Sequence, residues 1–138
     1  MKETVKLNIE EGLSFNIEIN GLNMKIDSSE EVGGKNRGPR PKSLMLAALG
    51  GCTGMDVASI MRKMKVPFEN LAIDVTGELT EDHPKHFKKM HITYIISGKG
   101  VDRKKVEKAV SLSQEKYCGV TYNYKASMEI THEIIIKE

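Results

Sequence analysis

The side chains best suited to nucleophilic or redox chemistry in this sequence are its two cysteines, Cys52 and Cys118. An ionised thiol is a nucleophile, a metal ligand and a redox group. The two cysteines are 66 positions apart, so they are not a CxxC motif, and their spacing does not show whether they meet. Cys52 stands among small, apolar neighbours in AALGGCTGMDV, residues 47–57. Because free cysteine is among the most buried residue types, plain core packing is the alternative to a reactive thiol.

A reactive Cys52 needs a positive charge that stabilises its thiolate. The apolar pattern predicts a helix from about Pro41 to Lys65, which places Cys52 about 11 residues, roughly 16 Å, from the first turn. The field of a helix N-terminus fades within one turn and does not reach it. Asp56, one turn further on, opposes thiolate formation. The cation must come from elsewhere, and arginine suits this role because it stays charged when partly buried.

Arg37 and Arg40 are the candidates among the four arginines of the chain. They stand in the Gly- and Pro-rich connection SSEEVGGKNRGPRP, residues 28–41, and long ordered loops are often functional. Arg62 is too far along the predicted helix, and Arg103 begins a second helix at the end remote from its cysteine. The alternative is that Arg37 and Arg40 each simply solvate the loop.

The histidines support a weaker hypothesis, a metal site. His83, His86 and His91 fall within HPKHFKKMH, and His132 lies on the predicted last strand. No cysteine or carboxylate at an established ligand spacing accompanies them.

The elements that must position these residues follow from the hydrophobic pattern. Residues 5–26 alternate with period two in three segments, and Asn20-Gly21 is a strong hairpin signal, so the chain begins with an antiparallel meander. After the first helix come strands near residues 71–75 and 90–96, a second helix and a last strand near 128–136. The second helix begins at Asp102 and ends at Gly119, which puts the second cysteine at its C-terminal edge. The order β-β-β-α-β-β-α-β indicates an α+β fold.

The first helix is apolar on nearly every face and is therefore expected to be a buried central helix. Its apolar positions recur at helical spacing, and glycines at three positions suggest close packing against another backbone. One small domain covers such a helix poorly, so a partner chain related by twofold symmetry is expected to complete the core. The apolar positions are Leu44, Ala47, Ala48, Gly51, Met55, Ala58 and Met61, and the glycines are Gly50, Gly51 and Gly54.

The composition sets the broad class of the protein. A length of 138 residues suits one domain over residues 1–138, and a net charge of +2 gives no argument for nucleic acid or a membrane as partner. There is no continuous run of about 18 apolar residues and no signal-peptide core, so a cytoplasmic location is expected. In that compartment two cysteines are free thiols or a working redox pair. No phosphate loop or nucleotide-binding fingerprint is present.

Two segments resemble the OsmC/Ohr family of osmotically inducible and organic hydroperoxide resistance proteins. GPRPKSLMLAALGGCTGMDVASIMRKMKV resembles the cysteine-bearing central helix of that family, and VEKAVSLSQEKYCGV resembles its second helix with the second cysteine near the end. The linking GELTEDHPKHFKKMHITYIISGKG is similar to a subgroup of OsmC-like proteins of unassigned substrate. With the order of elements, the resemblance covers essentially the whole chain.

The resemblance implies a fold, an assembly and an activity. It implies antiparallel sheets around the central helix, in an intertwined homodimer with sites at the subunit interface. It also implies a thiol peroxidase for organic hydroperoxides, with Cys52 as the peroxidatic and Cys118 as the resolving residue. Cys52 would become a sulfenic acid, Cys118 would condense with it to a disulfide, and an external dithiol, such as a lipoylated protein, would reduce the pair. No metal or bound cofactor is implied.

The sequence departs from the peroxidase pattern at two places. Pro41-Lys42 stands where the well-characterised branch has Pro-Glu, and residues 1–36 lack the arginine that this branch draws from its N-terminal region. Arg37, Arg40 or Lys42 would then supply the cation. These departures motivate an alternative function, a non-peroxidase protein that binds an apolar or electrophilic small molecule on the same scaffold.

Overall fold

The first part of the chain folds into a three-stranded meander. The computed structural model describes residues 1–138 and divides into two compact units, Met1–Met45 and Leu46–Glu138. In the first unit β1 (Lys6–Ile9), β2 (Phe15–Ile19) and β3 (Leu22–Ile26) pair antiparallel in sequence order. Asn20 and Gly21 both have positive φ, 50° and 76°, as a type I′ turn requires. The predicted meander and hairpin are confirmed, while one domain over residues 1–138 stays a prediction.

Asp27 organises the connection that follows β3. Its buried carboxylate accepts hydrogen bonds from the backbone N–H groups of Ser28 at 2.7 Å, Lys35 at 3.1 Å and Arg37 at 3.2 Å. Burial raises the pKa of Asp27, but these three N–H groups outweigh burial and leave the pKa below its ordinary value. The loop that carries the candidate arginines, with a short 3₁₀ turn at Glu30–Val32, is thus built around one buried acid.

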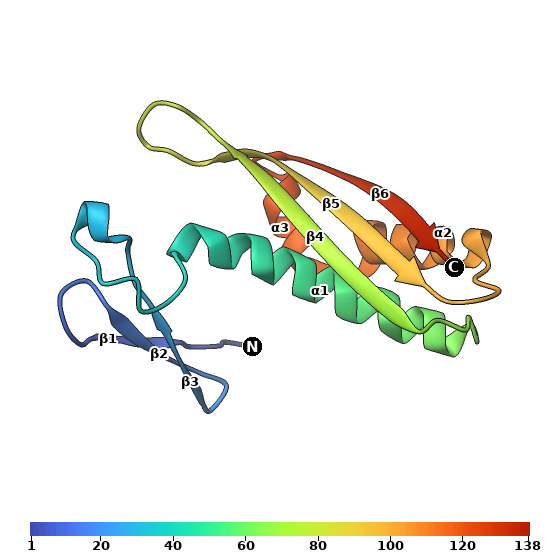
Figure 1. The fold of residues 1–138 in the computed structure, drawn as a ribbon, viewed down its shortest axis with the longest axis horizontal. Helices are drawn as coiled ribbons and strands as arrows, with labels where there is room; N and C mark the ends of the chain where they lie inside the picture. Colours follow the sequence, from blue (N-terminus) through green and yellow to red (C-terminus); the bar gives the residue numbers. More distant parts are fainter. The chain divides into compact units, whose positions relative to one another are not determined.

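The second unit contains a three-stranded sheet with the order β4-β5-β6, in which β4 spans Asn70–Leu79, β5 Phe87–Ser97 and β6 Glu129–Lys137. β4 and β5 are antiparallel, but β5 and β6 are parallel. The expectation of purely antiparallel sheets is therefore wrong for this pair. The chain leaves β5 through a helical crossover that contains α2 (Arg103–Leu112) and α3 (Gly119–Lys125), and such a crossover allows the next strand to run in the same direction (Figure 1).

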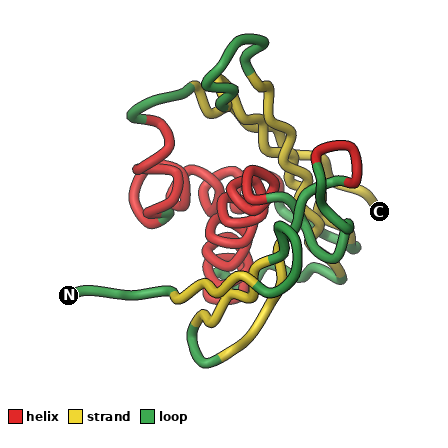
Figure 2. The backbone as a smooth tube through the Cα atoms, turned by 90° about the vertical axis from the view of Figure 1, so that its left-hand side faces the viewer, coloured by secondary structure: helices red, strands yellow, loops and turns green.

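The helices lie on one face of this sheet (Figures 1 and 2). α1 spans Pro41–Lys63, and its buried residues recur every fourth position. Alternate residues of β5 are fully buried, as are the inward residues of α2. The core positions are Leu49, Thr53, Val57 and Met61 of α1, Met90, Ile92, Tyr94 and Ile96 of β5, and Val106, Ala109 and Val110 of α2.

Of the apolar α1 positions named from the sequence, only Met61 is fully buried within one chain. Met55 is 77% exposed, and Ala47 and Gly51 are also exposed. A helix that is apolar on nearly every side gives the sequence pattern no way to choose a face. Within one chain α1 is only partly covered. That a partner chain completes its burial stays a prediction. It is also long and apolar enough to cross a membrane, a property shared by core helices of water-soluble proteins.

Two of the α1 glycines permit the close approach of β4. A Cβ atom on Gly54 would lie 2.7 Å from Ile73 Cδ1, and one on Gly50 would lie 3.1 Å from Val75 Cγ2. A Cβ atom on Gly51 would meet nothing within 4 Å. Close packing is therefore found at Gly50 and Gly54, but against side chains of a strand and not against another backbone as predicted.

The second predicted helix is interrupted. Asp102 caps α2 as predicted, since its side chain accepts from the N–H groups of Lys104 and Lys105. The helix then gives way to a π-helical turn, Ser113–Tyr117, and Gly119 begins α3 instead of ending α2. The Cys118 N–H donates to the Ser113 carbonyl at 2.8 Å, a five-residue span that widens the turn. Cys118 itself is extended, with φ −76° and ψ 99°, which separates the two helical pieces.

A buried hydrogen-bond network joins α1, β5 and the π-helical turn. Thr53 Oγ1 lies 2.6 Å from the Tyr94 hydroxyl and 2.7 Å from Ser113 Oγ. Gln114 Nε2 donates to both Thr53 Oγ1, at 3.1 Å, and the Tyr94 hydroxyl, at 2.9 Å. Ser113 Oγ also donates to Asp56 Oδ2 at 2.9 Å. Three segments distant in sequence are thus held in register by polar groups inside the core.

We expect Ser113→Ala to destabilise the protein by about 1–3 kcal/mol, because it removes the hydrogen bonds of the Ser113 hydroxyl to Thr53 and to the Asp56 carboxylate. Urea unfolding followed by circular dichroism measures this change. Ser111→Ala is the matched control, since Ser111 is an exposed serine on α2. Equal stability of the two variants would contradict a structural role for the network.

Candidate functional site

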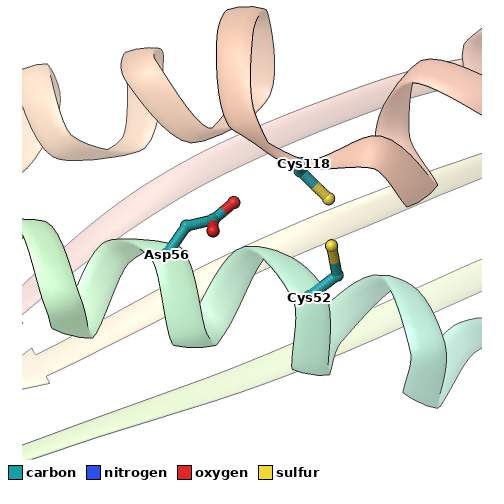
Figure 3. A group of neighbouring side chains, drawn as sticks. All are labelled: Cys52, Asp56 and Cys118. Carbon is teal, nitrogen blue, oxygen red and sulfur yellow. The ribbon is translucent and has the colours of Figure 1, made fainter.

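Cys52, Asp56 and Cys118 form one cluster (Figure 3). The two sulfur atoms and a carboxylate oxygen all lie within 4.8 Å of one another. Cys52 and Asp56 are one turn apart on α1 and therefore share a face, and Cys118 comes from the junction between the π-helical turn and α3. The thiols point toward each other (Figure 3). The structure thus brings together the two cysteines that the sequence left 66 positions apart.

The break in the second helical region sets the position of Cys118. As the N-cap of α3, Cys118 accepts a hydrogen bond on Sγ from the Thr121 N–H at 3.3 Å. An uninterrupted helix would leave the sulfur without this donor. Cys118 is only 3% exposed, whereas Cys52 is half-buried, so Cys52 is the more accessible thiol.

The pKa of the Cys52 thiol is raised above its ordinary value. Burial is the largest cause, and the nearby Cys118 and Asp56 raise the pKa further. A hydrogen bond from the Val120 N–H acts in the opposite direction without reversing the shift. No basic side chain contributes. The groups that set the pKa of Cys52 therefore do not include the cation that a reactive thiol requires.

The candidate arginines have contacts inside the first unit. Arg37 Nη1 lies 3.1 Å from Glu11 Oε2, and this ion pair raises the pKa of Arg37 and lowers that of Glu11. Arg40 Nη1 donates to Asn36 Oδ1 at 2.7 Å and to the Gly38 carbonyl at 3.1 Å. The Arg37 side chain is thus held by Glu11, between β1 and β2, and the Arg40 side chain by the loop built around Asp27. Their predicted action on Cys52, like that of Lys42 at the start of α1, stays a prediction.

The other two arginines of the chain are engaged elsewhere. The Arg62 guanidinium lies 5.6 Å from the centre of the Phe68 ring. Arg103 pairs with Glu107 at 3.2 Å and donates to the Ile134 carbonyl. These contacts agree with the sequence argument that set both arginines aside.

The histidines have separate partners. His91 contacts Thr131 and Glu133 on the neighbouring strand, at 2.6 Å and 3.3 Å. His132 stacks edge-on against Tyr94, with ring centroids 6.1 Å apart. None of the histidines belongs to the cluster of potential metal ligands, which consists of the two cysteines and Asp56.

Sequence reasoning missed the polar residues around the cysteines, because it considered charged groups as activators and treated neutral ones as packing. Thr53 and Ser113 were the residues from which a buried polar network could have been predicted. Both lie on the inward side of their helical segments and are fully buried, where a hydroxyl must have a partner.

Two hollows border α1 and α3. A groove of about 710 Å³ lies between α1 and β4, lined by Ala47, Gly51 and Met55 on the helix and Ile73 and Val75 on the strand, among others. Cys52 does not line it. A smaller hollow of about 410 Å³ lies beside Cys118, between Tyr117 and Tyr122, with Lys116 and Lys125 at its border. Of the two cysteines, only Cys118 lines the second hollow.

Comparison with known proteins places the chain in a family. Residues 33–133 match the family model described as OsmC-like protein. The protein YhfA from Escherichia coli strain K12 is 33% identical over 97 residues, which cover 70% of this chain and 72% of YhfA.

Solved structures have the same fold. A hypothetical protein from Aquifex aeolicus superposes with a TM-score of 0.84 and 30% identity, covering 100% of this chain and 99% of its own. An organic hydroperoxide resistance protein OsmC from Legionella pneumophila, described as a predicted redox protein, superposes with a TM-score of 0.69 and 15% identity, covering 98% and 97%. The chain therefore belongs to the OsmC-like protein family.

Proposed function

We propose that the protein is a dithiol peroxidase that reduces small organic hydroperoxides with Cys52 and Cys118. The observation that supports this most directly is the pair of facing thiols, whose sulfur atoms lie within 4.8 Å of each other. Membership of the OsmC-like family supports a redox or peroxide-related role. The fold shared with the Legionella hydroperoxide resistance protein is consistent with that role.

The unequal exposure of the thiols supports the assignment of their roles. In the proposed reaction the Cys52 thiolate attacks the terminal oxygen of the hydroperoxide, the O–O bond breaks, and the alkoxide takes a proton and leaves as an alcohol. Cys52 is then a sulfenic acid. The Cys118 sulfur attacks the Cys52 sulfur, the S–O bond breaks, and water leaves with the Cys118 proton. The half-buried Cys52 suits the first step, and the buried Cys118 suits the second.

The reaction returns to its start by thiol–disulfide exchange. An external dithiol, such as a lipoylated protein, donates two electrons and becomes a disulfide, while Cys52 and Cys118 become thiols again. No bound cofactor is needed for any of these steps. A cytoplasmic location, where thiols are kept reduced, is part of the same proposal.

The proposed reaction requires that the Cys52 thiol ionise readily. Its surroundings in the second unit instead raise the pKa of this thiol. We propose that Arg40 or Arg37, with Lys42 as the third candidate, supplies the cation in an intertwined homodimer. The uncovered apolar face of α1, with Met55 at 77% exposure, supports an assembly in which a second copy covers it.

A small-molecule-binding protein is the second candidate function. The groove between α1 and β4 supports it, because most residues that line the groove are apolar and Cys52 is not among them. Two further features favour a binding protein over a peroxidase: the raised pKa of Cys52, and Lys42 in place of the glutamate of the peroxidase pattern.

The peroxidase proposal predicts that reduced protein loses both thiols when cumene hydroperoxide is added. Free thiols are counted with a chromogenic disulfide reagent, and the disulfide is identified by mass spectrometry of peptides. In Cys118→Ser the reaction should stop at a Cys52 sulfenic acid that a dimedone probe captures, and in Cys52→Ser the remaining thiol should persist. Persistence of both native thiols at excess oxidant contradicts the proposal, and co-purification of an apolar ligand with inert thiols supports the binding protein.

The cation proposal predicts a change in the pH dependence of Cys52 alkylation, measured in a Cys118→Ser background so that one thiol reacts. Because a cation stabilises the thiolate, removing it raises the pKa of Cys52 and slows alkylation at pH 7, about tenfold for each pKa unit. We expect this for Arg40→Ala or Arg37→Ala, and no change for Arg103→Ala, which serves as the control. An unchanged titration in both loop variants would exclude both arginines as activators.

A further inference from the structure

We propose that the reduced protein binds a thiophilic divalent cation such as Zn²⁺ through the sulfur atoms of Cys52 and Cys118 and the carboxylate of Asp56. The inference does not require that the thiol pair reduce hydroperoxides. It assigns to Asp56 a role as a ligand in place of the unfavourable influence on Cys52 considered above.

The geometry of the cluster is close to that of a zinc site. Zn–S distances of about 2.3 Å and Zn–O distances of about 2.0–2.2 Å separate tetrahedral ligands by roughly 3.5–3.8 Å. The three donor atoms already lie within 4.8 Å of one another, so a contraction of about 1 Å suffices. Cys52 and Asp56 are four positions apart on α1, which places two ligands on one helical face. Three protein ligands leave one coordination position open.

The charge of the cluster favours a dication. Binding displaces the protons of two thiols and leaves two thiolates and a carboxylate around a doubly charged ion. The donor atoms of these three acidic groups lie together in one cluster. A metal ion and a loop arginine are thus alternative counter-ions for the same negative site.

Neighbouring donors support the ligands in the manner of an outer coordination shell. The Thr121 N–H donates to Cys118 Sγ at 3.3 Å, and the Val120 N–H acts on the Cys52 thiol. Ser113 Oγ donates to Asp56 Oδ2 at 2.9 Å and orients that carboxylate. Hydrogen bonds of this kind fix ligand orientation and add to metal affinity.

The test uses the full chain, kept reduced without air, with Cd²⁺ as an optical probe and Zn²⁺ in calorimetry. We expect one ion per chain and a sulfur-to-cadmium charge-transfer band in the ultraviolet. Cys52→Ser and Cys118→Ser should each lose most of the affinity, and Asp56→Asn should weaken it by about tenfold or more with both thiols intact. Asp74→Asn, which removes an exposed carboxylate from β4, is the matched control and should bind as the native protein does.

The outcomes separate the inference from the proposed peroxidase activity, because no hydroperoxide is present. Absence of stoichiometric binding by the reduced protein overturns the site, whatever the thiol count shows. Unchanged affinity in Asp56→Asn overturns the three-ligand site and leaves a dithiol alone, and unchanged affinity in the double cysteine variant places the ion elsewhere. Protein oxidised to the Cys52–Cys118 disulfide lacks both sulfur ligands and should not bind. Thermal unfolding of each variant establishes that it is folded.

Discussion

The Ser113 side chain and backbone connect the core of the second unit to its thiol pair. The hydroxyl contacts Thr53 inside the core and donates to Asp56, while the carbonyl accepts the Cys118 N–H through the π-helical turn. In a regular α-helix this carbonyl would accept from the N–H of the residue one position before Cys118, and the helix would not end at Cys118. The position of the second cysteine therefore depends on the same residue that satisfies the polar groups of α1.

The cluster of Cys52, Asp56 and Cys118 consists of acidic groups only. Two thiols and a carboxylate meet at a partly buried place where burial and like charge both favour the protonated thiol of Cys52. The Val120 N–H moderates this effect on Cys52 but does not remove it. A site of this kind acquires reactivity or affinity only from a positive charge brought to it, which is why an arginine and a metal ion are the two occupants that its chemistry suggests.

The sequence predicted those parts of the fold that have a strong local signal. Alternation and Asn20-Gly21 predicted the meander, and Asp102 predicted the start of α2, because turns and caps are encoded in a few adjacent residues. The parallel pairing of β6 and the buried face of α1 depend on contacts between distant segments. Gly119 was misassigned because a glycine after an apolar helical run is usual at a C-terminus, whereas here it opens a new helix.

Three faces of α1 have different neighbours, and this explains why the helix is apolar on nearly every side. Its stripe of Leu49, Val57 and other buried residues completes the core, the face of Cys52 and Asp56 meets the α2–α3 junction, and a third face borders an apolar groove. Small residues let β4 approach on one side, and glycine at position 51 leaves open space on another. A helix with a single buried face would carry polar residues where α1 has Ala47 and Met55. The absence of that polarity is the sequence-level reason to expect a second copy over the groove.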